Sequence, residues 1–107
     1  MSLYAVQVGY TPETWATLIK KPQDRLKAVG RAAEKLGGKL VNAWMTFGDY
    51  DIMVILEMPD QVAAAAFAVA VAAGGACKSV KTTPLLSIEQ GIEAMKKASS
   101  TGYEPPR

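Results

Sequence analysis

The segment Gly48-Asp49-Tyr50-Asp51 places two carboxylates and a phenol together between two strand-like runs. Carboxylate oxygens at such a turn could hold a hard cation or orient a polar substrate. The structural alternative is that Gly48 and Asp49 are ordinary hairpin residues, which supply permissive backbone angles and a local side-chain hydrogen bond. Tyr50 and Asp51 are the better functional candidates, because residues at a strand edge beside a turn can direct their side chains into a cavity.

Three aromatic residues, Tyr10, Trp15 and Trp44, are the other candidates for a ligand site. Small-molecule sites are mostly apolar with a few polar groups, although aromatic side chains are more often part of a core. Trp44 is the most informative, because it alternates with Asn42 and Thr46, a mixture that suits a partly wet cavity or an interface equally. The predicted ligand-binding candidates are Tyr10, Trp15, Trp44, Asp49, Tyr50 and Asp51.

The composition excludes several kinds of chemistry. The 107 residues include no histidine and one cysteine, Cys77, which removes the usual constellations of nucleophile and base and excludes haem ligation by histidine. A thiol without a histidine to activate it is most often a small buried hydrophobe. We therefore expect no metal site and no cofactor, and whether the chain is an enzyme stays open.

Charge and hydropathy limit the partners. The net charge is +2, from 12 basic and 10 acidic residues without a block of like charges, so we expect neither nucleic acid nor a membrane as a partner. The longest apolar run, residues 62–73, is shorter than the roughly 18 residues of a membrane-spanning helix, and it predicts a buried helix. The N-terminal residues carry no secretory signal pattern, so the expected location is the cytoplasm.

Alternation of polar and apolar residues predicts the strands. The predicted ranges are 3–10, 39–47, 52–58 and 76–83. The second of them assigns Val41 and Phe47 to the core face and Leu40 to the reverse face. With the following strand it predicts a hairpin across the turn at Gly48.

Capping signals predict the helices that lie between and after these strands. Thr11-Pro12 begins a short helix, and Pro22 closes it and opens a second one that ends at Gly37-Gly38. Asp60 caps the apolar helix, and Ser87 with Gln90 forms a capping box for a final short helix. Residues 99–107 have no periodicity, so we predict one domain over residues 1–98 followed by a loosely ordered tail.

This order of elements predicts an α+β fold of the ferredoxin-like βαββαβ type, with helices on one face of a four-stranded antiparallel sheet. The opposite face is too apolar to remain in water as one patch. By alternation it includes Leu3, Ala5, Leu40, Trp44, Met53 and Ile55. We therefore predict a homodimer or a higher homo-oligomer, formed by association of sheet with sheet.

Several well-separated motifs resemble those of the GYD-domain family, over residues of about 4 to 96. They are Val8-Gly9-Tyr10-Thr11-Pro12 with Trp15, Pro22-Gln23-Asp24-Arg25, Leu36-Gly37-Gly38, Phe47-Gly48-Asp49-Tyr50-Asp51, Glu57-Met58-Pro59-Asp60 and Lys81-Thr82-Thr83-Pro84-Leu85. The motif that names the family maps onto Gly48, Tyr50 and Asp51, with Asp49 in between. The resemblance implies a dimeric α/β barrel, in a family whose members are largely of unknown function.

Fold and residues together predict an oligomeric module that binds a small organic molecule or has a regulatory role, with the ligand near Trp44, Tyr50 and Asp51. The alternative is a cofactor-independent enzyme of the dimeric α/β-barrel type, monooxygenase-like or isomerase-like, in which Tyr50 or Asp51 handles a proton. A purely structural assembly is the third interpretation, which applies if the fold contains no pocket.

Overall fold

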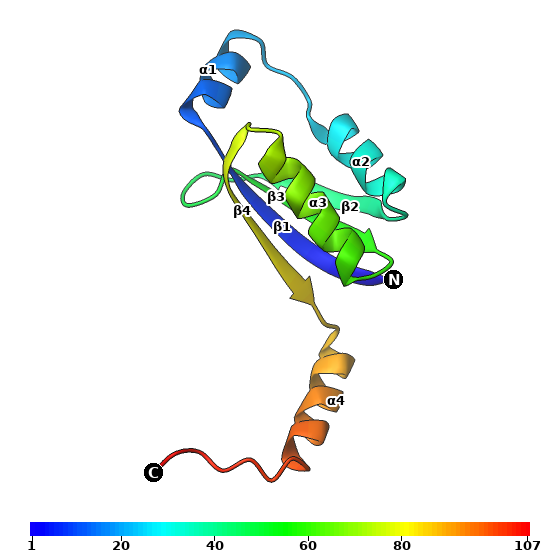
Figure 1. Ribbon diagram of the computed structural model, residues 1–107. Coiled ribbons are helices and arrows are strands. Elements are labelled where there is room, and N and C mark those ends of the chain that lie inside the picture. Colours follow the sequence, from blue (N-terminus) through cyan, green and yellow to red (C-terminus); the bar gives the residue numbers. More distant parts are fainter.

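The computed structural model describes residues 1–107 and contains one four-stranded antiparallel sheet with the strand order β2-β3-β1-β4 (Figure 1). Its elements follow the order β1 (Ser2–Tyr10), α1 (Pro12–Lys20), α2 (Leu26–Lys35), β2 (Lys39–Met45), β3 (Ile52–Met58), α3 (Gln61–Ala73), β4 (Cys77–Leu85) and α4 (Ile88–Ser99). The predicted ferredoxin-like α+β fold is confirmed, with α4 as an addition after the last strand.

The core lies between the sheet and the two helices α2 and α3, which cover the same face (Figure 1). Val6 of β1 stands opposite Val54 of β3, and both side chains are buried on this face. Phe67 from α3 and Ala33 from α2 complete the core, and their side chains are 2% and 0% exposed. The alternation within β1 and β3 therefore has the physical cause predicted for it, which is one buried face.

Capping residues fix three of the four helix starts as predicted. The Thr11 hydroxyl accepts a hydrogen bond from the Thr14 amide at 3.1 Å, and Asp60 accepts one from Ala63 at 2.8 Å. Ser87 and Gln90 exchange the two hydrogen bonds of a capping box, at 3.0 and 2.9 Å.

The start of α2 differs from the prediction. The helix begins at Leu26 instead of Pro22, and residues 21–25 form an irregular connection after α1. The Asp24 carboxylate accepts a hydrogen bond from the Leu26 amide at 2.8 Å, which satisfies a backbone donor at the start of the helix. Four residues predicted to be helical are therefore free to line a cleft.

The prediction for residues 39–47 was right in the start of the strand at Lys39, but wrong in the facing of Leu40 and Val41 and in the end of the strand. The pairing register shifts between Leu40 and Asn42, so Leu40 lies opposite the buried Leu56 while Val41 is 50% exposed. A bulge adds one residue to a strand and thus reverses the alternation on one side of it. At the other end β2 stops at Met45, which leaves Phe47 in the turn with 95% of its surface exposed.

The predicted apolar helix over residues 62–73 is present as α3, but within this chain it is buried on one side only. Ala63, Ala64 and Phe67 are buried against the sheet, but Val62 is 78% and Val69 is 67% exposed. A helix that rests on a sheet buries one side only, and no other element of this chain covers the outer side. None of the four helices has the length and apolar character needed to cross a membrane.

Two parts of the molecule lie outside the packed core. The helix α4 stands beyond the end of the sheet, and residues 100–107 follow it without regular secondary structure (Figure 1). The sheet face opposite α2 and α3 has no helix over it, and we call it the open face. It carries Leu3, Ala5 and Gln7 of β1, Asn42 and Trp44 of β2, Met53, Ile55 and Glu57 of β3, and Lys81 and Thr83 of β4.

Candidate functional site

A cleft of about 820 Å³ lies between α1, the start of α2, α3 and the helix-covered side of the sheet. Of its 25 lining residues, 18 are hydrophobic. The walls include Trp15 and Leu18 from α1, Val29 from α2, Val71 from α3 and Ile52 from β3. Because α1 and α2 are separated by the connection of residues 21–25, they do not close over the end of the sheet. This opening exposes apolar side chains that would otherwise form core.

Two of the predicted aromatic residues pack against each other in the cleft wall. The rings of Tyr10 and Trp15 lie 5.4 Å apart between centroids, at an angle of 88° between their planes, which is an edge-to-face arrangement. The start of α1 is held in place by the Ala76 carbonyl, which accepts hydrogen bonds from the Thr11 amide at 3.1 Å and from the Thr14 hydroxyl at 2.8 Å. Tyr10 is thus held at the end of β1, and Trp15 is held by the anchored first turn of α1.

Asp51 holds the backbone of Tyr10 in place. Its carboxylate accepts a hydrogen bond of 2.8 Å from the backbone amide of Tyr10, and its own amide donates to the Val8 carbonyl at 2.8 Å. The register between β1 and β4 shifts at Gly9 and Tyr10. At this irregularity the Asp51 carboxylate is the hydrogen-bond acceptor of the Tyr10 amide. Asp51 thus connects the turn that names the family to the end of β1.

The rest of that turn does not reach the cleft. Gly48 has a φ of 141°, a backbone angle that favours glycine, and Asp49 is exposed. The Tyr50 carbonyl accepts a hydrogen bond of 2.7 Å from the Thr46 hydroxyl, and the Tyr50 ring is not among the lining side chains. Trp44 borders the cleft but is 47% exposed and belongs to the open face. Of the six candidates, the structure brings Tyr10, Trp15 and Trp44 to the cleft.

The lining residues that were not predicted to bind a ligand include the charged Arg25 and the thiol of Cys77. The ion pairs of the chain join Lys39 to Glu57 at 3.8 Å and Lys97 to Glu93 at 3.7 Å, so Arg25 has no carboxylate partner. Its guanidinium is 3.5 Å from the Gln23 side-chain oxygen. The available signal in the sequence was a cation within the polar connection between two helices, but only the fold shows that this connection borders an apolar cleft.

Burial raises the pKa of two titratable groups in the cleft wall, Tyr10 and Cys77. Burial raises the pKa of the Tyr10 hydroxyl; the nearby Cys77 raises it further, Arg25 lowers it, and Asp51 raises it. Burial also raises the pKa of the Cys77 thiol, which Arg25 lowers and Asp51 raises. Both groups are therefore protonated near neutral pH, when each can donate a hydrogen bond and neither is an activated nucleophile. The structure also contains no cluster of three or more cysteine, aspartate or glutamate side chains that could hold a metal ion.

The comparison with protein families agrees with the motifs. The model of the GYD domain matches residues 4–95, and the chain belongs to this family. Among solved structures, one that resembles the chain is that of TTHA0845 from Thermus thermophilus, with 15% sequence identity and a TM-score of 0.47, over 81% of this chain and 95% of that one. No curated protein matches the sequence.

Proposed function

We propose that this chain is a small-molecule-binding or regulatory module, whose ligand is a mainly apolar organic molecule with an anionic group. The observation that carries this proposal is the apolar cleft of about 820 Å³ with the unpaired guanidinium of Arg25 at its border. Ligand pockets in proteins measure roughly 300–1,000 Å³ and combine apolar walls with a few polar groups. A guanidinium suits a carboxylate or a similar anion, because its donors match two anionic oxygens.

Two neutral groups of the cleft wall favour the same kind of ligand, whereas the Asp24 carboxylate, which also lines the cleft, accepts the Leu26 amide. The protonated hydroxyl of Tyr10 and the protonated thiol of Cys77 are hydrogen-bond donors. Together with Arg25 they offer donors to acceptor atoms of a ligand, while Trp15 and Leu18 contact its apolar part. We infer that the anionic group lies near Arg25 and that the apolar part extends over α1.

Binding is better supported than catalysis. The enzyme alternative assigned proton transfer to Tyr50 or Asp51, but Tyr50 lies outside the cleft and the Asp51 carboxylate is engaged by the Tyr10 amide. Tyr10 and Cys77 do not replace them as bases, because burial favours their protonated forms. A cofactor-independent enzyme of the dimeric α/β-barrel type therefore stays the alternative.

We also propose that the module self-associates through its open face. This face carries large apolar side chains, of which Leu3 is 41% and Trp44 is 47% exposed. Contiguous apolar patches of this kind mark interaction surfaces.

The ligand cleft is tested with 8-anilinonaphthalene-1-sulfonate, an apolar fluorescent anion. Ala70 lines the cleft, whereas Ala65 lies elsewhere on the exposed surface of α3. We expect Ala70→Phe to fill the cleft and weaken dye binding at least fivefold, and Ala65→Phe to leave it within twofold of the wild type. Equal affinity of all three proteins would contradict the proposal, because the dye would then bind outside the cleft.

A further inference from the structure

We propose that α4 is an arm that packs on the open face of a second copy of this chain. The helix carries an apolar stripe made of Ile88, Ile92 and Met95, which lie on one side because they are spaced by four and three residues. These side chains are 82%, 46% and 71% exposed. The helix points away from the end of the sheet and rests on no other element (Figure 1). Its stripe therefore has no partner within the same chain.

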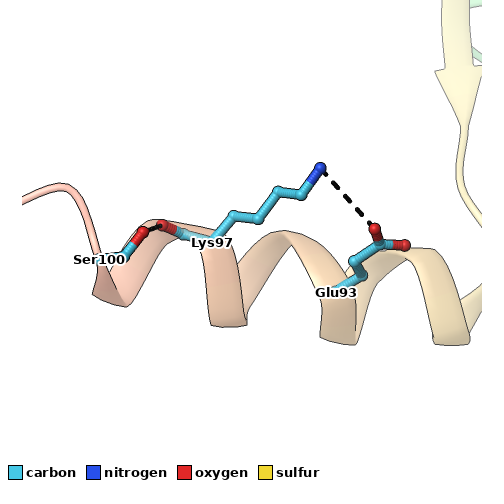
Figure 2. Close-up of polar contacts among 3 residues, drawn as sticks. All are labelled: Glu93, Lys97 and Ser100. Atoms are coloured by element: carbon cyan, nitrogen blue, oxygen red, sulfur yellow. Dashed lines mark hydrogen bonds and ion pairs between the residues drawn. The ribbon is translucent and has the colours of Figure 1, made fainter.

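The polar contacts of α4 are all local. Lys97 pairs with Glu93 at 3.7 Å, and the Ser100 hydroxyl donates to the Lys97 carbonyl at 2.8 Å (Figure 2). The capping box of Ser87 and Gln90 satisfies the first turn. Isolated helices shorter than roughly 12–15 residues are marginal in water, and α4 has 12 residues. Such a helix needs a packing surface in order to remain folded.

The whole chain exposes too much surface for a compact monomer. Its accessible surface is 7786 Å², whereas a compact monomer of its 11.4 kDa exposes about 5,800 Å². The excess of about 2,000 Å² is larger than the roughly 800 Å² that each partner buries in a standard protein interface. The radius of gyration is 17.0 Å, against about 13 Å for a compact domain of this length. The shape of the chain is that of a subunit whose arm is covered elsewhere.

The open face of a second copy matches this arm. It is apolar at its centre, and Lys81 at its β4 edge has no carboxylate partner, while Glu89 beside the stripe has no basic partner. A 12-residue helix is about 18 Å long and about 10 Å wide. It would cover less than half of a four-stranded face, because such a face is about 19 Å across at the spacing of strands and its nine-residue strands are about 30 Å long. The remainder of the face is left for direct contact between the sheets.

A reciprocal exchange of arms closes as a two-fold dimer, in which each copy gives one helix and receives one. The proposal rests on the self-association proposed above and is independent of the ligand cleft. Its test measures mass instead of dye binding, so failure of one proposal leaves the other standing.

The decisive variant is Ile92→Glu/Met95→Glu, which places two charges on the stripe. Ala94→Glu is the matched control, because Ala94 is exposed on a different side of the same helix. We expect a dimer for the wild type and for Ala94→Glu by light scattering, and a dimer dissociation constant at least tenfold higher for the double variant. A common mass for all three proteins, whether dimer or monomer, would overturn the proposal.

Cross-linking then locates the arm. In a Cys77→Ser background, chains with Met95→Cys are mixed with chains of different mass that carry Asn42→Cys on the open face or Glu34→Cys on α2. We expect a short bismaleimide to join Met95→Cys to Asn42→Cys in chains of unequal mass, and not to Glu34→Cys. Cross-linking to position 34, or to neither position, would overturn the placement of α4 on the open face.

Discussion

The backbone amide of Tyr10 donates a hydrogen bond of 2.8 Å to the carboxylate of Asp51, across 41 positions of sequence. It joins the turn of the GYD motif to the strand end from which the cleft wall begins. Asp51 is therefore a positioning residue for Tyr10, and it does not itself line the cleft. This gives the aspartate of the motif a structural task.

We predict that Asp51→Ala lowers the free energy of unfolding by about 1–3 kcal/mol, because the partly buried Tyr10 amide then loses its acceptor. Asp51→Asn keeps an oxygen at this place and should cost less. Asp49→Ala is the control and should change the value by less than about 0.5 kcal/mol, because Asp49 is exposed. Urea unfolding measures all three, and equal effects at positions 49 and 51 would refute the role given to Asp51.

Two glycines of the second helical region should respond oppositely to alanine. A Cβ at Gly38 would overlap the Glu57 carbonyl oxygen, whereas a Cβ at Gly30 in α2 would meet no atom within 4 Å. We expect Gly38→Ala to destabilise the chain by more than about 1 kcal/mol. Gly30→Ala should stabilise it by up to about 1 kcal/mol, because alanine favours a helix more than glycine does. Thermal unfolding checks the pair, and a stabilising Gly38→Ala would show that β2 and β3 are not in such close contact.

The stability should fall at alkaline pH. The pKa values of Cys77 and Tyr10 are raised in the folded chain, from ordinary values of 9.0 and 10.0. The folded chain therefore holds these protons more tightly than the unfolded chain, and their contribution is complete below pH 9 and is lost as the pH rises through the folded-state values. Urea unfolding from pH 8 to above pH 10 should show this loss, and Cys77→Ser should make it smaller. Equal slopes for both proteins would exclude Cys77 as a source.

Local patterns were sufficient to predict most of the fold. Thr11, Asp60 and Ser87 accept the predicted capping bonds, and the alternation in β1 agrees with its burial. The errors arise where the pairing of strands or the packing of helices departs from the polar and apolar pattern of the sequence. The bulge beside Val41 is defined by the register against β3, and no residue pattern in β2 marks it. The outer side of α3 is apolar but exposed. The sequence of a helix does not show how many of its sides pack against other elements.

The candidate site could be predicted only in part. Tyr10, Trp15 and Trp44 were proposed because aromatic side chains can line an apolar pocket, and all three border the cleft. Arg25 was not proposed as a ligand-binding residue, because its relation to the cleft depends on where α2 begins, and that start is set by the hydrogen bond from the Leu26 amide to Asp24. Asp51 was predicted as ligand-binding from its place in the turn, but its partner lies in a distant strand.

The role of Arg25 is tested by comparing two dyes of similar shape and different charge. We measure the affinities of anionic 8-anilinonaphthalene-1-sulfonate and neutral N-phenyl-1-naphthylamine for the wild type, Arg25→Met and, as a control, Arg31→Met on the exposed side of α2. If the Arg25 guanidinium holds an anion, Arg25→Met weakens binding of the anionic dye about tenfold, a loss of about 1.4 kcal/mol in binding free energy. The affinity for the neutral dye stays unchanged. Unchanged binding of the anionic dye, or equal losses for both dyes, would contradict an anion site at Arg25.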